Sequence, residues 1–218
     1  MFDQQRVRYH PAVHPVDHVM VVVTDLDGAA RRYESEHGLV ALPGGRHQGL
    51  GTANAIVPLG TDYIELIAVV DADEAAQNAV GRFLAHRLAT TGEGIVAVCL
   101  TTADAPATAE RTGSSPVPMS RTLPNRNELR WELLGMEGAL LHGLPFFITW
   151  PLDADHPARM PADHPSGAHG ISWVELGGDP DRVRQWVGTD EAQLHLVGGE
   201  PGLRRFAVAT PDAEIILT

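Results

Sequence analysis

The sequence predicts an α+β protein built from repeated β-α-β-β-β units, whose open, curved mixed β-sheets surround a cleft. Two observations support this fold class. Apolar and β-branched runs typical of buried strands alternate with segments of helical period. The order of one strand, one helix and three strands also begins three times along the 218 residues. Two such units paired edge to edge would close an eight-stranded open barrel around a cleft.

The first predicted unit covers residues 17–70. Val19 to Thr24 is a nearly continuous β-branched run, which favours a buried strand. Thr24 or Asp25 caps the following helix, and Gly38 ends it in the usual left-handed position. Three strands are then predicted at residues 39–42, 52–59 and 62–70, with a glycine-rich loop before the second of them.

The remaining elements repeat this order. A helix is predicted over residues 71–91, and the second unit follows at 94–150. Its helix opens with Asp104 and Pro106. A linker rich in proline, aspartate and histidine (151–167) precedes the third unit at 168–218. The strands of the second and third units are predicted at residues 95–101, 117–122, 128–134, 144–150, 170–176, 193–197, 203–209 and 213–217.

Composition and charge restrict the partners. The formal net charge of −12 argues against nucleic acid and against anionic membranes, which both favour cationic surfaces. No stretch approaches the roughly 20 apolar residues of a membrane span. The segment before the first unit, an arm at 1–16, lacks the apolar centre of a signal peptide, so we expect a cytoplasmic protein. The single cysteine, Cys99, lies in an apolar run and is interpreted as structural.

Four segments carry a resemblance to a known family. DHVMVVVTDLDGAARRYESEHGL (17–39), PGGRHQGLGTAN (43–54) and YIEL (63–66) resemble the glyoxalase-like, or vicinal oxygen chelate, superfamily. LPFFITW (144–150) fits the same branch of longer glyoxalase-like proteins. The resemblance implies paired β-α-β-β-β modules around a divalent metal, and a small, oxygen-rich substrate.

The resemblance also implies metal ligands. In that family one ligand comes from the start of a module's first strand and another from its fourth strand, which gives His18 and Glu65. Imidazole and carboxylate suit Fe, Mn, Zn, Ni or Co. The second unit offers no equivalent, since Gly94 stands at its first-strand position and LPFFITW has no carboxylate. The third unit offers His169, and a His18, Glu65, His169 site requires the third unit to pair with the first. His164 competes with His169 for this role.

Other residues of the predicted cleft have alternative roles. His47, on the glycine-rich loop, is the candidate general base, because histidine titrates in the useful pH range. Arg46, Asn54, Arg130 and Trp150 are the candidate substrate-binding residues. Arg46 or Arg130 could instead form an ion pair with Glu65, and His18 could simply cap its strand.

Two functions therefore remain open. The first is a metal-dependent isomerase, lyase or dioxygenase. The alternative is a metal-free small-molecule binding or sequestration protein of the bleomycin-resistance type, which the missing ligands of the second unit favour. Because three units are an odd number, pairing across subunits in a homodimer is a further expectation.

Overall fold

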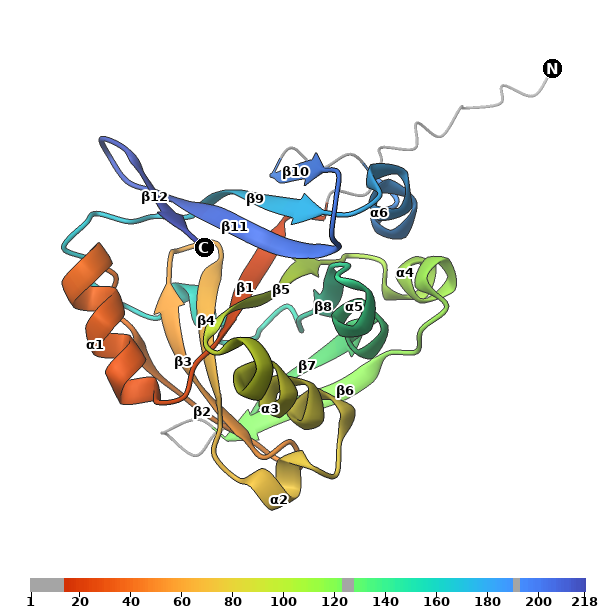
Figure 1. Ribbon diagram of the computed structural model, residues 1–218, viewed down its shortest axis with the longest axis horizontal. Coiled ribbons are helices and arrows are strands. Elements are labelled where there is room, and N and C mark those ends of the chain that lie inside the picture. The colour runs from red at the N-terminus through yellow and green to blue at the C-terminus, as the bar shows by residue number, and fades with distance from the viewer. Residues whose placement is uncertain (1–13, 123–127, 190–192) are drawn as a thin grey trace.

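The computed structural model describes residues 14–122, 128–189 and 193–218 (Figure 1). The predicted arm at 1–16 therefore lies mostly outside the described residues. The fold is an α+β arrangement with one eight-stranded sheet, one four-stranded sheet and several short helices. This confirms the predicted fold class.

The eight-stranded sheet joins the first two units. The first unit comprises β1 (Val16–Val22), α1 (Leu26–His37), β2 (Leu42–His47), β3 (Thr52–Pro58) and β4 (Tyr63–Val69). The second comprises β5 (Gly94–Thr101), α4 (Ala105–Thr112), β6 (Val117–Thr122), β7 (Glu128–Leu134), α5 (Met136–His142) and β8 (Phe146–Thr149). The strand order is β2-β3-β4-β1-β5-β8-β7-β6, so the seam between the units is the antiparallel pair of β1 and β5.

β1 forms because four of its seven residues, Val19 to Val22, are a continuous apolar run that suits burial on both faces. All its residues are buried, as expected for a central strand between parallel β4 and antiparallel β5. Asp25 then caps α1 by accepting hydrogen bonds from the backbone N–H groups of Asp27 and Gly28. Gly38 ends the helix at φ 64°, in the left-handed conformation predicted for it.

Three local differences from the predicted elements have simple causes. The helix expected over residues 71–91 is divided into α2 (Ala72–Ala75) and α3 (Ala79–Thr91). Asn78 caps the second of these through the N–H of Gly81. Part of the expected glycine-rich loop is strand β2, because its backbone pairs with β3. The short helix α5 follows a left-handed glycine, Gly135, and gives no strong sequence signal.

The third unit forms a separate sheet. It comprises β9 (Ile171–Gly177), α6 (Pro180–Val187), β10 (Leu194–Val197), β11 (Gly202–Ala209) and β12 (Glu214–Leu217), in the strand order β10-β9-β11-β12. A 3-10 turn, η1 (Pro157–Arg159), lies in the preceding linker. The pairing of the third unit with the first, which a site containing His169 requires, is therefore not observed: β1 pairs with β4 and β5.

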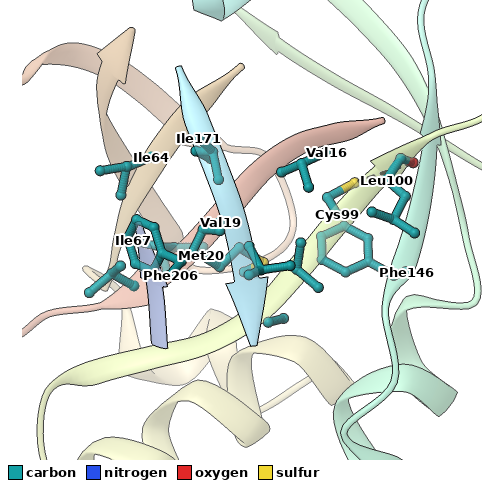
Figure 2. Close-up of a cluster of buried hydrophobic side chains, with 14 of the residues drawn as sticks. Val16, Val19, Met20, Ile64, Ile67, Cys99, Leu100, Phe146, Ile171 and Phe206 are labelled. Atoms are coloured by element: carbon teal, nitrogen blue, oxygen red, sulfur yellow. Dashed lines mark hydrogen bonds between the residues drawn. The ribbon is translucent and has the colours of Figure 1, made fainter. Parts of the chain in front are cut away.

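Both sheets share one hydrophobic core. Ile171 and Phe206, from β9 and β11, lie with Val19, Met20 and Ile67 in a continuous buried cluster (Figure 2). This apolar contact explains how the four-stranded sheet is held on the larger one. Among the described residues, each helix is too short or too polar to span a lipid bilayer.

One buried carboxylate also joins the two sheets. Asp62, which is 4% exposed, accepts a hydrogen bond at 2.9 Å from the backbone N–H of Ile171 and one at 3.1 Å from the hydroxyl of Thr61. Burial raises the pKa of Asp62 to about 6, and the hydrogen bond from Ile171 opposes this rise only in part. Near pH 7 the carboxylate of Asp62 is therefore ionised although it is buried, which lowers the stability of the fold.

Asp62→Asn is expected to stabilise the fold at pH 8 by roughly 2–3 kcal/mol, and to change it little at pH 4. The folded pKa lies above the unfolded value, so the stability of the wild type is full below about pH 4 and declines as pH rises to about 6. Asparagine keeps an acceptor for Ile171 without a charge. Urea unfolding at both pH values measures the effect. A constant difference across this range would show that Asp62 titrates normally.

Candidate functional site

A pocket opens on one face of the eight-stranded sheet. Every strand of that sheet except β5 contributes to its lining, and the contributing residues alternate along the strands, as residues on one face must. The cavity itself is small, about 50 Å³, and the unfilled space including the open solvent at its mouth is about 550 Å³. The lining includes His18, Met20, His47, Asn54, Ile56, Tyr63, Glu65, Met119, Arg121, Trp131, Leu133, Phe146, Ile148 and Trp150.

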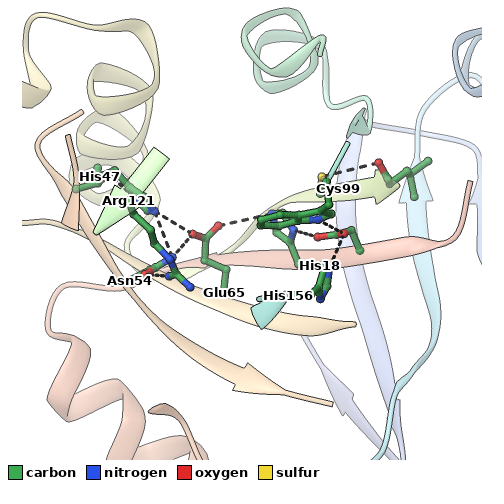
Figure 3. Close-up of polar contacts among 11 residues, drawn as sticks. His18, His47, Asn54, Glu65, Cys99, Arg121 and His156 are labelled. Atoms are coloured by element: carbon green, nitrogen blue, oxygen red, sulfur yellow. Dashed lines mark hydrogen bonds and ion pairs between the residues drawn. The ribbon is translucent and has the colours of Figure 1, made fainter. Parts of the chain in front are cut away.

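The two units contribute unlike walls to this pocket. The first unit supplies the polar groups His18, His47, Asn54 and Glu65. The second supplies mainly apolar and aromatic side chains, together with one charged residue, Arg121. Figure 3 shows Glu65 lying between His18 on one side and the cluster of His47, Asn54 and Arg121 on the other. A small apolar pocket with a few convergent polar groups is the usual form of a ligand site.

A bulge in β1 fixes His18. The pairing of β1 with β5 shifts register between Val16 and His18, so that neighbouring side chains in the strand come into contact. Oδ1 of Asp17 accepts a hydrogen bond of 2.7 Å from Nδ1 of His18. This contact turns the other ring nitrogen, Nε2, toward Glu65, whose Oε2 lies 3.7 Å away.

The buried carboxylate of Asp17 accepts hydrogen bonds from several side chains. Its Oδ2 accepts hydrogen bonds from Nε1 of Trp150 at 2.9 Å, from Nε2 of His156 at 3.1 Å and from the hydroxyl of Thr101 at 3.2 Å. Burial alone would raise the pKa of Asp17, but the hydrogen bonds from His156 and His18 outweigh it and hold that pKa well below the usual range. Asp17 is therefore an anion throughout the physiological range.

Glu65 occupies the middle of the polar wall. It is 8% exposed, and its Oε1 accepts a hydrogen bond of 2.6 Å from Nδ2 of Asn54. Oε2 lies 3.7 Å from Nε2 of His18, and Oε1 lies 3.7 Å from Nε2 of His47. Both imidazoles are thus close to the carboxylate without a direct hydrogen bond to it.

His47 is buried at the end of β2. Its Nδ1 lies 2.9 Å from the hydroxyl of Thr52, and its Nε2 lies 3.3 Å from Nδ2 of Asn54. Burial lowers the pKa of His47, while the charge of Glu65 opposes this effect. The two contacts are satisfied together when Nδ1 donates to Thr52, which leaves Nε2 as an acceptor inside the pocket.

The structure brings together some of the predicted site residues. His18, Glu65, His47, Asn54 and Trp150 all line the pocket. The expected direction of Glu65, toward the cleft and away from the helices, is therefore found. These five predicted site residues therefore lie in one pocket, but their roles stay predictions.

The other predicted site residues lie outside the pocket. Arg46 is exposed and forms ion pairs with Asp71 at 3.0 Å and Glu74 at 2.6 Å. Arg130 is exposed and pairs with Glu128 at 2.6 Å. Neither arginine is paired with Glu65, because each has a carboxylate partner close to it on the surface.

The histidines of the third unit also lie away from Glu65. His169 is exposed, and its Nδ1 contacts the backbone oxygen of Gly167 at 3.1 Å. His164 is buried, but both ring nitrogens are used: Nδ1 accepts from the N–H of Val40 and Nε2 donates to the oxygen of Pro58. The structure thus does not assemble a site from His18, Glu65 and either of these residues.

Three functional candidates were not predicted from the sequence. Asp17 fixes His18, His156 contacts the other oxygen of Asp17, and Arg121 donates to Asn54. A usable signal existed for Arg121, because it alternates with Met119 in a strand and so shares its face. No comparable signal marks Asp17, since its contact with His18 depends on the bulge.

Two sets of side chains could supply ligands to a divalent metal. Among the described residues, the trio of potential ligands whose atoms all lie within 4.8 Å of one another is Asp17, His18 and Cys99. Asp17 already accepts hydrogen bonds at both oxygens, and burial raises the pKa of the Cys99 thiol well above its usual value. His18 also belongs to a second set with Glu65 and His47, which is spread more widely but faces the pocket. Two imidazoles and one carboxylate are a chemically suitable donor set.

Comparisons with known proteins place the chain in a family. Residues 16–194 match the family described as the glyoxalase-like domain. The chain is a member of that family. The predicted resemblance to glyoxalase-like proteins is confirmed. No curated protein matches this glyoxalase-like protein significantly.

One solved structure shows the same fold at low sequence identity, and others are similar over a smaller part of the chain. A hypothetical protein from Staphylococcus aureus is 17% identical, with a TM-score of 0.62, and the match covers 94% of this chain and 84% of that one. Methylmalonyl-CoA epimerase from Mycobacterium tuberculosis is 20% identical, with a TM-score of 0.43, over 62% of this chain and 85% of that one. A Streptomyces coelicolor methylmalonyl-CoA epimerase in complex with 2-nitronate-propionyl-CoA is 21% identical, with a TM-score of 0.46, over 63% and 98%.

Proposed function

We propose that this glyoxalase-like protein is a divalent-metal-dependent enzyme that acts on a small, oxygen-rich molecule. The main support for this proposal is the contact between Asp17 and His18, which directs Nε2 of His18 at the buried carboxylate of Glu65. We assign His18, Glu65 and His47 as the residues that hold the metal. His47 thereby takes the place that the sequence predicted for His169.

The environment of Glu65 supports this assignment. A buried carboxylate is costly unless it is compensated, and Glu65 has one amide donor and two imidazoles at 3.7 Å. Two ligands bound to one ion at roughly 2.0–2.2 Å lie about 3–3.5 Å apart. Each imidazole is 3.7 Å from a different oxygen of Glu65, so a shared ion requires the two imidazoles to move toward each other. Asp17 would act as the outer partner that orients His18 and increases its basicity.

The remaining groups suit chemistry at oxygen. A bound divalent ion would act as a Lewis acid toward neighbouring oxygens of the substrate. Asn54 donates to Glu65 and restrains its carboxylate. Trp131 and Trp150, whose rings lie 5.5 Å apart, form part of the apolar side of the pocket. Such a donor set suits an isomerase, a lyase or a dioxygenase that uses a metal.

Metal titration of stripped protein without an affinity tag tests the proposal. We expect one Mn²⁺, Fe²⁺, Co²⁺, Ni²⁺ or Zn²⁺ ion per chain by calorimetry. His18→Ala and Glu65→Gln should each weaken binding by more than the roughly 10–100-fold typical of an outer partner, and His47→Ala should do the same. His169→Ala is the matched control and should leave the affinity unchanged. Absence of binding heat with every ion would disprove the metal-dependent function.

Metal-free binding of a small molecule is the second candidate function. The apolar wall of the second unit, which contributes no His, Cys, Asp or Glu to the lining, is the observation that favours it. It predicts that His18→Ala changes ligand affinity equally in the presence and absence of a chelator. Metal-dependent ligand binding contradicts it.

A further inference from the structure

Arg121 differs from the paired arginines on the surface. It is 3% exposed, lies in β6 and lines the pocket. One terminal nitrogen donates a hydrogen bond of 3.1 Å to Oδ1 of Asn54. Its Nε is buried and has no hydrogen-bond partner among the described residues. Burying a guanidinium with so few acceptors is unfavourable, which indicates that an acceptor is missing from the pocket.

Glu65 does not fill this role. Within the described part of the chain, Arg121 forms no ion pair with any carboxylate at 4.0 Å or less. Asn54 stands between the two charges, since its amide nitrogen donates to Glu65 while its oxygen accepts from Arg121. The amide thus fixes both groups and leaves the guanidinium available to an additional anion.

The surroundings of Arg121 restrict the class of that anion. Arg121 carries one positive charge, and the nearby carboxylate of Glu65 already offsets part of it. The remaining attraction suits a monoanion better than a phosphate dianion. A planar carboxylate also matches the fork of donors on arginine. Met119 and Trp131 line the same side of the pocket and suit an apolar or aromatic body.

We propose that Arg121 binds the carboxylate of a small ligand whose apolar body lies against Trp131 and Phe146. This inference rests on the proposed function, in which the oxygen-bearing part of the same ligand reaches His18 and Glu65. The carboxylate contact does not require the metal, and the two assignments can therefore fail separately.

The test compares hydrocinnamate with its uncharged amide on metal-stripped full-length protein, by calorimetry and by tryptophan fluorescence. We expect the wild type to prefer the acid by at least roughly tenfold, as one charge-assisted contact provides. Arg121→Met should abolish the preference, and Arg121→Lys should retain part of it. Arg130→Met, the same change at an exposed arginine in the neighbouring strand, should have no effect. Circular dichroism melting establishes that each variant is folded.

Several results would overturn the inference. These are equal affinity of the wild type for acid and amide, no binding of either at millimolar concentration, or an acid preference that survives in Arg121→Met. Tighter binding of phenyl phosphate would reject the carboxylate assignment. A preference that appears only with added metal and disappears in Glu65→Gln would assign the carboxylate to the metal, which supports the proposed function and rejects the role of Arg121. Loss of preference in Arg121→Met without any metal binding would support Arg121 and reject the metal.

Discussion

Replacing Asp17 with alanine is expected to lower the free energy of unfolding by about 3–5 kcal/mol, as removal of one partner from a buried charge network typically does. His18, Trp150, His156 and Thr101 would each lose an acceptor inside the protein. The imidazole of His18 would also lose the group that holds its proton on Nδ1. Metal affinity should fall by roughly 10–100-fold in consequence.

Urea unfolding and metal calorimetry measure the two effects of Asp17→Ala. Thr101→Val is the matched control, because it removes one donor to Asp17 and leaves the carboxylate in place. It should cost about 1 kcal/mol and leave the metal affinity unchanged. The depressed pKa of Asp17 adds a pH effect: its stabilisation is present above the unfolded pKa near 4 and is lost on further acidification. A loss below 1 kcal/mol in Asp17→Ala would contradict this role of the Asp17 carboxylate.

Replacing Phe146 with alanine is expected to cost about 3–5 kcal/mol, because a fully buried aromatic ring is removed. Phe146 lies at the start of β8 and packs edge-on against the ring of His18, with centroids 5.5 Å apart and planes at 71°. The loss combines the transfer free energy of the ring with the cavity that remains. The cavity would adjoin the pocket and allow His18 to change orientation.

Thermal and urea unfolding measure the loss at Phe146, and metal titration shows whether His18 moves. Phe146→Leu keeps most of the volume and should cost about 1–2 kcal/mol, with a smaller effect on metal affinity. Leu152→Ala, at a fully exposed apolar residue, should be neutral within about 0.5 kcal/mol. Equal stability of the leucine and alanine variants at residue 146 would show that the region collapses around the missing ring.

The resemblance to glyoxalase-like proteins implied that His18 and Glu65 lie together, and the strand pairing within the first unit explains why they do. The β-branched run of β1 and the caps of α1 mark the first strand and helix, and β1 and β4 are parallel neighbours. His18 is paired in register with Tyr63, so Glu65 falls two residues further along the same face. These features require no knowledge of the other units.

The partner of the first unit could not be predicted in the same way. Three segments share one order of elements, and His169 precedes its strand much as His18 does. The choice between them depends on the long-range register of β1 with β5, which no local pattern encodes. The same pairing carries Arg121 across the sheet to Asn54, which explains why a residue so distant in sequence was missed.

The division of the pocket into unlike walls gives the bound molecule a direction. Its groups would meet a cation at Arg121, a carboxylate and imidazoles at Glu65, and hydrocarbon around Ile148 and Leu133. Reversing a ligand would bring its polar end against apolar side chains and leave Arg121 without an anion. Three different contacts that do not lie on one line also distinguish a molecule from its mirror image. A pocket with two unlike walls would therefore favour one hand of a chiral ligand.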